Sequence, residues 1–161
     1  MMFFFIGCGS SFSPVLIDME NWRFGNLQTD PLRSHQPESV ECSPSSFRIE
    51  SEQLEIKTDL CNYVFLEFDL LQDLPKGTPA DFLLLHTGLW APEIATAHAA
   101  FMINGAVFWE QEAEIPSSAQ FFFFEGEIPI DAHKGDAVQL HIHNHGANDW
   151  RLGYFRRMEE E

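Results

Sequence analysis

The stretch VFLEFDLL, residues 64–71, decides the fold class of this chain. Apolar residues at 64, 66, 68 and 70 alternate with a second set that includes Glu67 and Asp69. Successive side chains of a strand point to opposite faces of a sheet, so this two-residue period is typical of a half-buried strand. Similar short runs lie on both sides of it, at 47–49, 54–58, 81–87, 97–103, 106–112, 120–125, 137–144 and 150–156.

Turn residues separate these runs. Asn104-Gly105 joins two of them and is the strongest short-range hairpin signal, because a type I′ turn needs two positive φ angles. Only residues 93–100, rich in Ala, leave a helix open as an alternative. Eight or nine short strands at this spacing predict an all-β fold, an antiparallel two-sheet β-sandwich that is jelly-roll-like and spans residues 46–158.

The segment before this domain has a different composition. Residues 9–45 are rich in Ser, Pro, Asn and Gln. We interpret them as a tether and an irregular lead-in, with one short strand near residues 15–17.

Residues 61–155 resemble the galactose-binding-like jelly rolls of carbohydrate-binding modules. The resemblance lies in the pattern of turns followed by strands and in a closing strand that ends in aromatics, Tyr154-Phe155. It implies a sandwich that binds a glycan. The elements Cys61-Asn62-Tyr63 and His143-Asn144-His145-Gly146 also resemble a group of secreted bacterial proteins, a likeness that implies no activity.

The N-terminus, MMFFFIGCGSS at residues 1–11, resembles the lipobox of a bacterial lipoprotein signal. The resemblance implies that residues 1–8 are a truncated signal and that Cys8 is lipidated. The apolar run is shorter than an ordinary signal core and no Lys or Arg precedes it, which a start codon placed too far downstream would explain. The implied location is extracytoplasmic, in the periplasm or at the outer-membrane surface.

The remaining cysteines fit the same compartment. With Cys8 carrying lipid, Cys42 and Cys61 remain as one pair, and disulfides persist in oxidising compartments. We predict a disulfide between them; two buried free thiols are the alternative.

The charge balance constrains the partners. The chain has 25 acidic and 9 basic residues, a formal net charge of −16. Nucleic acids need clustered Lys and Arg, and an anionic membrane surface repels such a chain. We therefore expect no nucleic-acid partner, and membrane attachment only through a lipid on Cys8.

The most informative stretch for chemistry is AVQLHIHNHG, residues 137–146. Val138, Leu140 and Ile142 share one face of a strand, which leaves His141 and His143 on the other face. Neutral imidazole is the commonest protein ligand of zinc and copper. The predicted metal ligands are His86, His98, His141 and His143. The alternative is a polar, hydrogen-bonded outer sheet face or a sugar-binding surface.

Glycan binding needs flat rings for sugar faces and planar polar groups for hydroxyls. Trp90 is the best candidate, because Gly and Pro place its loop at the surface. The predicted ligand-binding residues are Trp90, Asn144, His145, Asn148, Asp149 and Arg151.

Known catalytic motifs are absent from the sequence, so no catalytic residue is predicted. The leading interpretation is an exported, lipid-anchored, non-enzymatic binding module for a glycan or another envelope or surface ligand. The first alternative is an exported protein that binds zinc or copper through the histidines, and a metalloenzyme with the same ligands is the second. The FFFF run at 121–124 is expected to be covered on both faces or packed under a loop.

Overall fold

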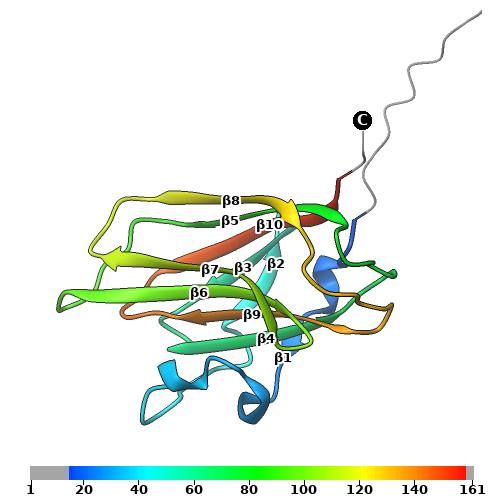
Figure 1. Cartoon of the computed structure of the whole chain (residues 1–161). Helices are drawn as coiled ribbons and strands as arrows, with labels where there is room; N and C mark the ends of the chain where they lie inside the picture. Colours follow the sequence, from blue (N-terminus) through cyan, green and yellow to red (C-terminus); the bar gives the residue numbers. More distant parts are fainter. Residues whose placement is uncertain (1–14, 159–161) are drawn as a thin grey trace, which may run out of the picture.

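A computed structural model describes residues 15–158 and folds them into two antiparallel five-stranded sheets, stacked face to face (Figure 1). The sheet with the order β1-β4-β9-β6-β7 is named the histidine sheet here, and the one with the order β2-β3-β10-β5-β8 the second sheet. The strands are β1 (Arg23–Phe24), β2 (Phe47–Glu50), β3 (Gln53–Lys57), β4 (Tyr63–Asp69), β5 (Pro79–His86), β6 (Ala95–Ile103), β7 (Ala106–Ile115), β8 (Gln120–Glu127), β9 (Ala137–His143) and β10 (Asp149–Arg157). The predicted all-β sandwich is confirmed.

Every run with a two-residue period in the sequence is a strand, from β2 to β10. Asn104 and Gly105 both have positive φ and connect β6 to β7, as the hairpin signal predicts. One local prediction, the strand near residues 15–17, was wrong, and the helix left open as an alternative at 93–100 does not form. The segment at 93–100 enters strand β6 rather than a helix, because its alternate side chains pack into the core, and Val15 makes only an isolated bridge to Arg156 instead of a strand.

The core lies between the two sheets. Val138, Leu140 and Ile142 point into it, as the period of β9 predicts, and are fully buried. Phe82 of the second sheet lies at its centre, with ring centroids 4.5 Å from Phe101 and 5.2 Å from Phe124. Interdigitated aromatic rings of this kind hold the sheets together by apolar burial.

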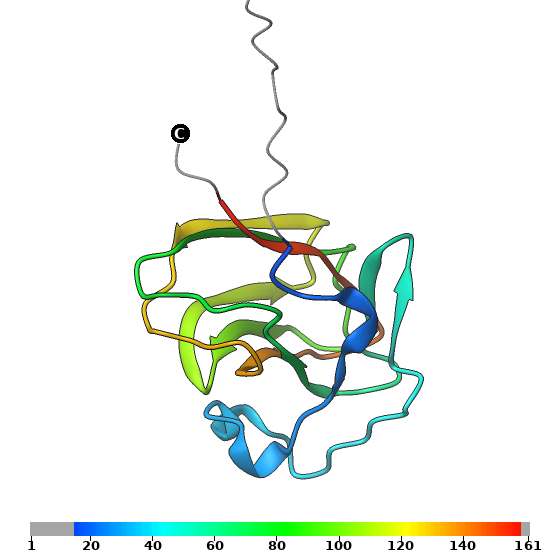
Figure 2. The same ribbon diagram turned by 90° about the vertical axis from the view of Figure 1, so that its right-hand side faces the viewer.

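Residues 15–45 pack against the sandwich. They contain three short 3-10 helices, η1 (Met19–Asn21), η2 (Leu27–Thr29) and η3 (Arg33–His35). Leu16 and Ile17 are buried in the core. The part from 26 to 45, named the cover segment here, runs along the outer side of the histidine sheet (Figures 1 and 2). The expected irregular lead-in is thus irregular in local structure, and its residues 26–45 cover the outer face of the histidine sheet.

The FFFF run at 121–124 lies on the edge strand β8, where alternate side chains face the core and the solvent. Phe122 and Phe124 pack against the core, whereas Phe121 and Phe123 are 62% and 68% exposed. The expected coverage on both faces was wrong, because β8 is the last strand of the second sheet and no segment of residues 15–158 covers its outer face there.

Cys42 and Cys61 form a disulfide, as predicted, which joins the end of the cover segment to the residues before β4. Cys8 lies outside the described residues. Within residues 15–158, no helix has the length and apolar character needed to cross a bilayer.

Candidate functional site

The outer face of the histidine sheet gathers imidazoles from neighbouring strands. His143 of β9 lies directly opposite His98 of β6, and His141 lies opposite Ala100. Since alternate residues share a face, His98, His141 and His143 all lie on the side away from the core. The cover segment adds His35, the last residue of η3.

His35 and His98 are in direct contact. Their Nδ1 atoms are 3.1 Å apart, and the rings meet edge to face with centroids 4.3 Å apart. The other nitrogen of His98, Nε2, lies 2.6 Å from Oε1 of Glu110 on β7. A carboxylate only accepts hydrogen bonds, so His98 donates from Nε2, and in the neutral ring a lone pair remains on Nδ1.

His141 is held by the cover segment. Its Nδ1 lies 2.9 Å from Oδ2 of Asp30, and both side chains are fully buried. The same oxygen accepts a hydrogen bond of 2.6 Å from the hydroxyl of Tyr63, and the backbone N–H of Leu32 donates to Oδ1 at 2.9 Å. The ring of His141, the hydroxyl of Tyr63 and the carboxylate of Asp30 therefore form one hydrogen-bond network between the cover segment and strands β4 and β9.

Electrostatics keeps Asp30 ionised within this network. Burial alone raises the pKa of a carboxyl group, but the hydrogen bonds from His141 and Tyr63, with the backbone bond from Leu32, outweigh it, so the pKa of Asp30 is lowered. Burial and the contact with Asp30 raise the pKa of Tyr63, which stays a hydrogen-bond donor. Asp30 is thus an ionised carboxylate that accepts a hydrogen bond from the Nδ1–H of His141.

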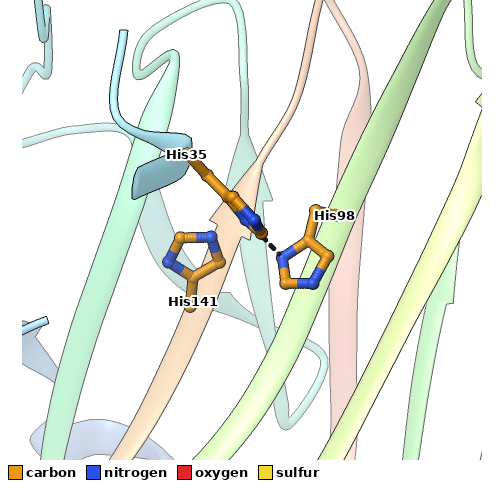
Figure 3. A group of neighbouring side chains, drawn as sticks. All are labelled: His35, His98 and His141. Carbon is orange, nitrogen blue, oxygen red and sulfur yellow. Dashed lines mark hydrogen bonds between the residues drawn. The ribbon is translucent and has the colours of Figure 1, made fainter. Parts of the chain in front are cut away.

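One atom of the network has no partner. Nε2 of His141 is buried and makes no hydrogen bond within residues 15–158. Buried polar atoms are nearly always hydrogen-bonded or bound to an ion. Figure 3 shows a ring nitrogen of His141 on the side that faces His35, and the three histidines each offer one nitrogen within 4.8 Å of the others. Such a trio is suited to a transition-metal ion.

The structure brings together only two of the four histidines predicted as metal ligands. His98 and His141 are in the trio, and His143 lies beside it, with its ring 4.8 Å from that of His145. Burial, then its histidine neighbours, lower the pKa of His143 to about 4, so the ring is neutral at pH 7.

His86 does not join these histidines. It ends β5 in the second sheet and points into the interior, where its ring centroid lies 4.8 Å from that of Trp150. Burial lowers its pKa. His35, in contrast, was not among the sequence candidates, since an irregular segment has no period that assigns a residue to a face.

A second candidate surface lies on the loops at one end of the sandwich. The side chain of Trp90 is exposed, with the residue 62% accessible, as its Gly- and Pro-rich loop predicts. Its backbone is fixed by buried Asn148, whose Oδ1 accepts from the N–H of Trp90 at 2.7 Å and whose Nδ2 donates to its C=O at 3.2 Å. Gly146 has a positive φ and lies so close to the carbonyl of Trp90 that any side chain there would clash. The ring of Trp90 therefore projects into solvent from a rigid backbone.

A hollow of 400 Å³ adjoins this loop. Glu93 and His145 provide its polar lining, and Pro92 and Ile94 provide apolar surface. Asn144 is buried nearby and donates to the hydroxyl of Thr58 at 2.9 Å, so its amide supports the loops from below.

The remaining predicted ligand residues lie apart from this hollow. Asp149 is half-buried at the start of β10, where its carbonyl accepts from the backbone of Thr87. The guanidinium of Arg151 is engaged on the second sheet by Glu55 at 2.8 Å and Glu50 at 3.3 Å. The loop surface thus exposes Trp90, His145 and Glu93, whereas the predicted ligand residues Asn144 and Asn148 are buried beneath it and support its loops.

Comparisons with known proteins give a likeness of fold. The chain is similar to a carbohydrate-binding module of family 4, with 11% identity over 87% of this chain and 96% of that chain and a TM-score of 0.46. It is also similar to a family 16 carbohydrate-binding module (9% identity, 74% and 85% of the two chains, TM-score 0.42). A family 61 module solved with β-1,4-galactotriose is similar at 14% identity (89% and 91%, TM-score 0.39). No model of a protein family and no curated protein matches the chain. The solved structures that are similar to this chain thus include carbohydrate-binding modules, at low identity and with TM-scores below 0.5.

Proposed function

We propose that this chain is an exported, lipid-anchored, non-enzymatic binding module that recognises a glycan, or a similar surface ligand, at the loops around Trp90. The observation that carries the proposal is the exposed ring of Trp90 on a backbone clamped by Asn148. An aromatic face stacks on the C–H face of a sugar ring, and a rigid platform loses little conformational entropy on binding.

The hollow beside Trp90 supplies the polar part of such a site. Glu93 accepts hydrogen bonds from sugar hydroxyls, and His145 both donates and accepts them. The net charge of −16 repels anionic polymers, which favours neutral glycans over sulfated or uronate-rich ones.

Glycan binding is tested on an array of neutral and anionic glycans with fluorescently labelled protein. We expect retention on neutral glycans, and an affinity that falls about tenfold or more in Trp90→Ala, because the stacking face is lost. Phe123→Ala is the matched control, since it removes an equally exposed ring on the second sheet and should leave binding unchanged. If the protein bound no glycan on the array, or if Phe123→Ala lost binding and Trp90→Ala did not, the proposed surface would be refuted.

Export and anchoring rest on different residues. The disulfide between Cys42 and Cys61 supports an oxidising compartment. From the lipobox-like N-terminus, we propose that Cys8 is the point of lipid attachment.

For the anchor, we expect the protein expressed in a bacterial host with an intact secretion signal upstream to partition into the detergent phase of a Triton X-114 extraction. Cys8→Ala should move it to the aqueous phase, because a thioether-linked lipid is the only proposed anchor. Cys42→Ala is the control that removes a cysteine without removing the anchor. Aqueous partitioning of the exported protein with Cys8 intact would contradict the lipid anchor.

A further inference from the structure

We propose that His35, His98 and His141 bind one divalent transition-metal ion between the cover segment and the histidine sheet. This site is separate from the loop surface of Trp90 and does not depend on glycan binding. Its ligands come from three parts of the chain that are far apart in sequence: η3, β6 and β9.

The spacing of the nitrogens fits one ion. In a tetrahedral zinc site with Zn–N bonds of about 2.0–2.1 Å, two ligand nitrogens lie about 3.3 Å apart. Nδ1 of His35 and Nδ1 of His98 are 3.1 Å apart, and the ligand atoms of all three histidines lie within 4.8 Å of one another. Metal binding would draw the third nitrogen, Nε2 of His141, closer to the other two.

In His98 and His141, the ring nitrogen away from the proposed ion donates a hydrogen bond, which leaves the lone pair on the nitrogen that faces the ion. His98 donates from Nε2 to Glu110, so its Nδ1 is the free base, and His141 donates from Nδ1 to Asp30, so its free base is Nε2. A metal-binding histidine usually donates its second N–H to a carboxylate or carbonyl in this way. Asp30 and Glu110 also place negative charge beside the ion without occupying its coordination positions.

A purely structural hydrogen-bonded cluster explains less of what is observed. The contact between His35 and His98 accounts for one nitrogen of each ring, but Nε2 of His141 stays buried without a partner in the part of the chain described. A metal ion satisfies that atom and both Nδ1 atoms at once. No fourth protein ligand joins the trio among residues 15–158, so a water molecule or a small anion would complete the coordination.

The nature of the ligands selects the metal. Three imidazoles without thiolates favour zinc, copper, nickel or cobalt over calcium or magnesium, which prefer oxygen ligands. Since His35 is only half-buried, an ion reaches the site from the surface of the cover segment. Binding would also fasten that segment to the sheet, because ligands on both must be in place.

The test uses the full chain, purified without a histidine tag and dialysed against a chelator. We expect one equivalent of cobalt(II) to give the intense visible absorption of a tetrahedral site, and zinc to displace it with a 1:1 stoichiometry in calorimetry. The variant His35→Gln should weaken zinc binding by about 100-fold or more, since loss of even an outer hydrogen bond to a ligand costs about 10–100-fold. His35 is chosen because its side chain is not in the buried network, so the variant should fold.

Controls separate this site from adventitious binding. His133→Gln removes an exposed histidine with 78% side-chain accessibility in a distant turn and should leave zinc binding unchanged. Trp90→Ala should bind zinc normally, and His35→Gln should keep its glycan binding, so the two proposals fail independently. Absence of zinc and cobalt binding in the folded wild type overturns the inference, and so does wild-type affinity in His35→Gln.

Discussion

Replacing Asp30 by alanine is expected to lower the free energy of unfolding by about 4 kcal/mol. The change leaves the Nδ1–H of His141 and the hydroxyl of Tyr63 without their acceptor in a fully buried setting, and each buried orphan donor costs about 1–3 kcal/mol. The measurement is urea denaturation at pH 7. Because the pKa of Asp30 lies below its ordinary value of 3.8, its contribution is present above that pH and is lost as the pH falls through the folded value.

Asp69→Ala is the control for the loss of an aspartate. Asp69 forms an ion pair of 2.7 Å with Arg23, but its side chain is 59% exposed, and such pairs contribute about 0–1 kcal/mol. A loss of less than about 1 kcal/mol in Asp30→Ala would mean that the cover segment does not hold the buried network described here.

Removing the disulfide is the second large effect. In the double variant Cys42→Ala, Cys61→Ala, the free energy of unfolding should fall by about 3 kcal/mol, because the cross-link closes a loop between residues 19 positions apart and restricts the unfolded chain. Denaturation in urea with and without a reductant measures it. The wild type under reducing conditions should approach the double variant, and the double variant should not respond to the reductant. Equal stability of the oxidised wild type and the double variant would contradict the cross-link.

The period of the strands predicted most of the fold. The alternation in β9 placed Val138, Leu140 and Ile142 inside and His141 outside, and the Asn104-Gly105 turn fixed one hairpin. These features depend on neighbouring residues only, so they can be predicted from a single sequence. The exposed ring of Trp90 followed from the Gly and Pro residues of its loop for the same reason.

The sequence does not show which strands pair with each other or which segment covers each face of a sheet. His86 is in phase with Phe82 and Leu84, so it points inward, and it belongs to the second sheet, away from His98 and His141. Strand order depends on pairing between residues that are distant in the chain, which periodicity does not encode.

The cover segment was the harder case. Asp30 and His35 lie in irregular structure, and their partners are 111 and 63 residues away in the chain. No local pattern marks either residue, although both decide how the histidine face is used. Burial of His141 therefore follows from the cover segment and not from the strand that carries it.

Two carboxylates, Glu110 of β7 and Asp30 of the cover segment, fix the tautomers of the sheet histidines His98 and His141. Long-range ¹H–¹⁵N NMR of the imidazoles tests this claim directly in metal-free protein at pH 7. We predict that His98 is protonated at Nε2 and His141 at Nδ1, with a slowly exchanging Nδ1 proton that reports the bond to Asp30. Mixed tautomers with rapid proton exchange at both rings would contradict it.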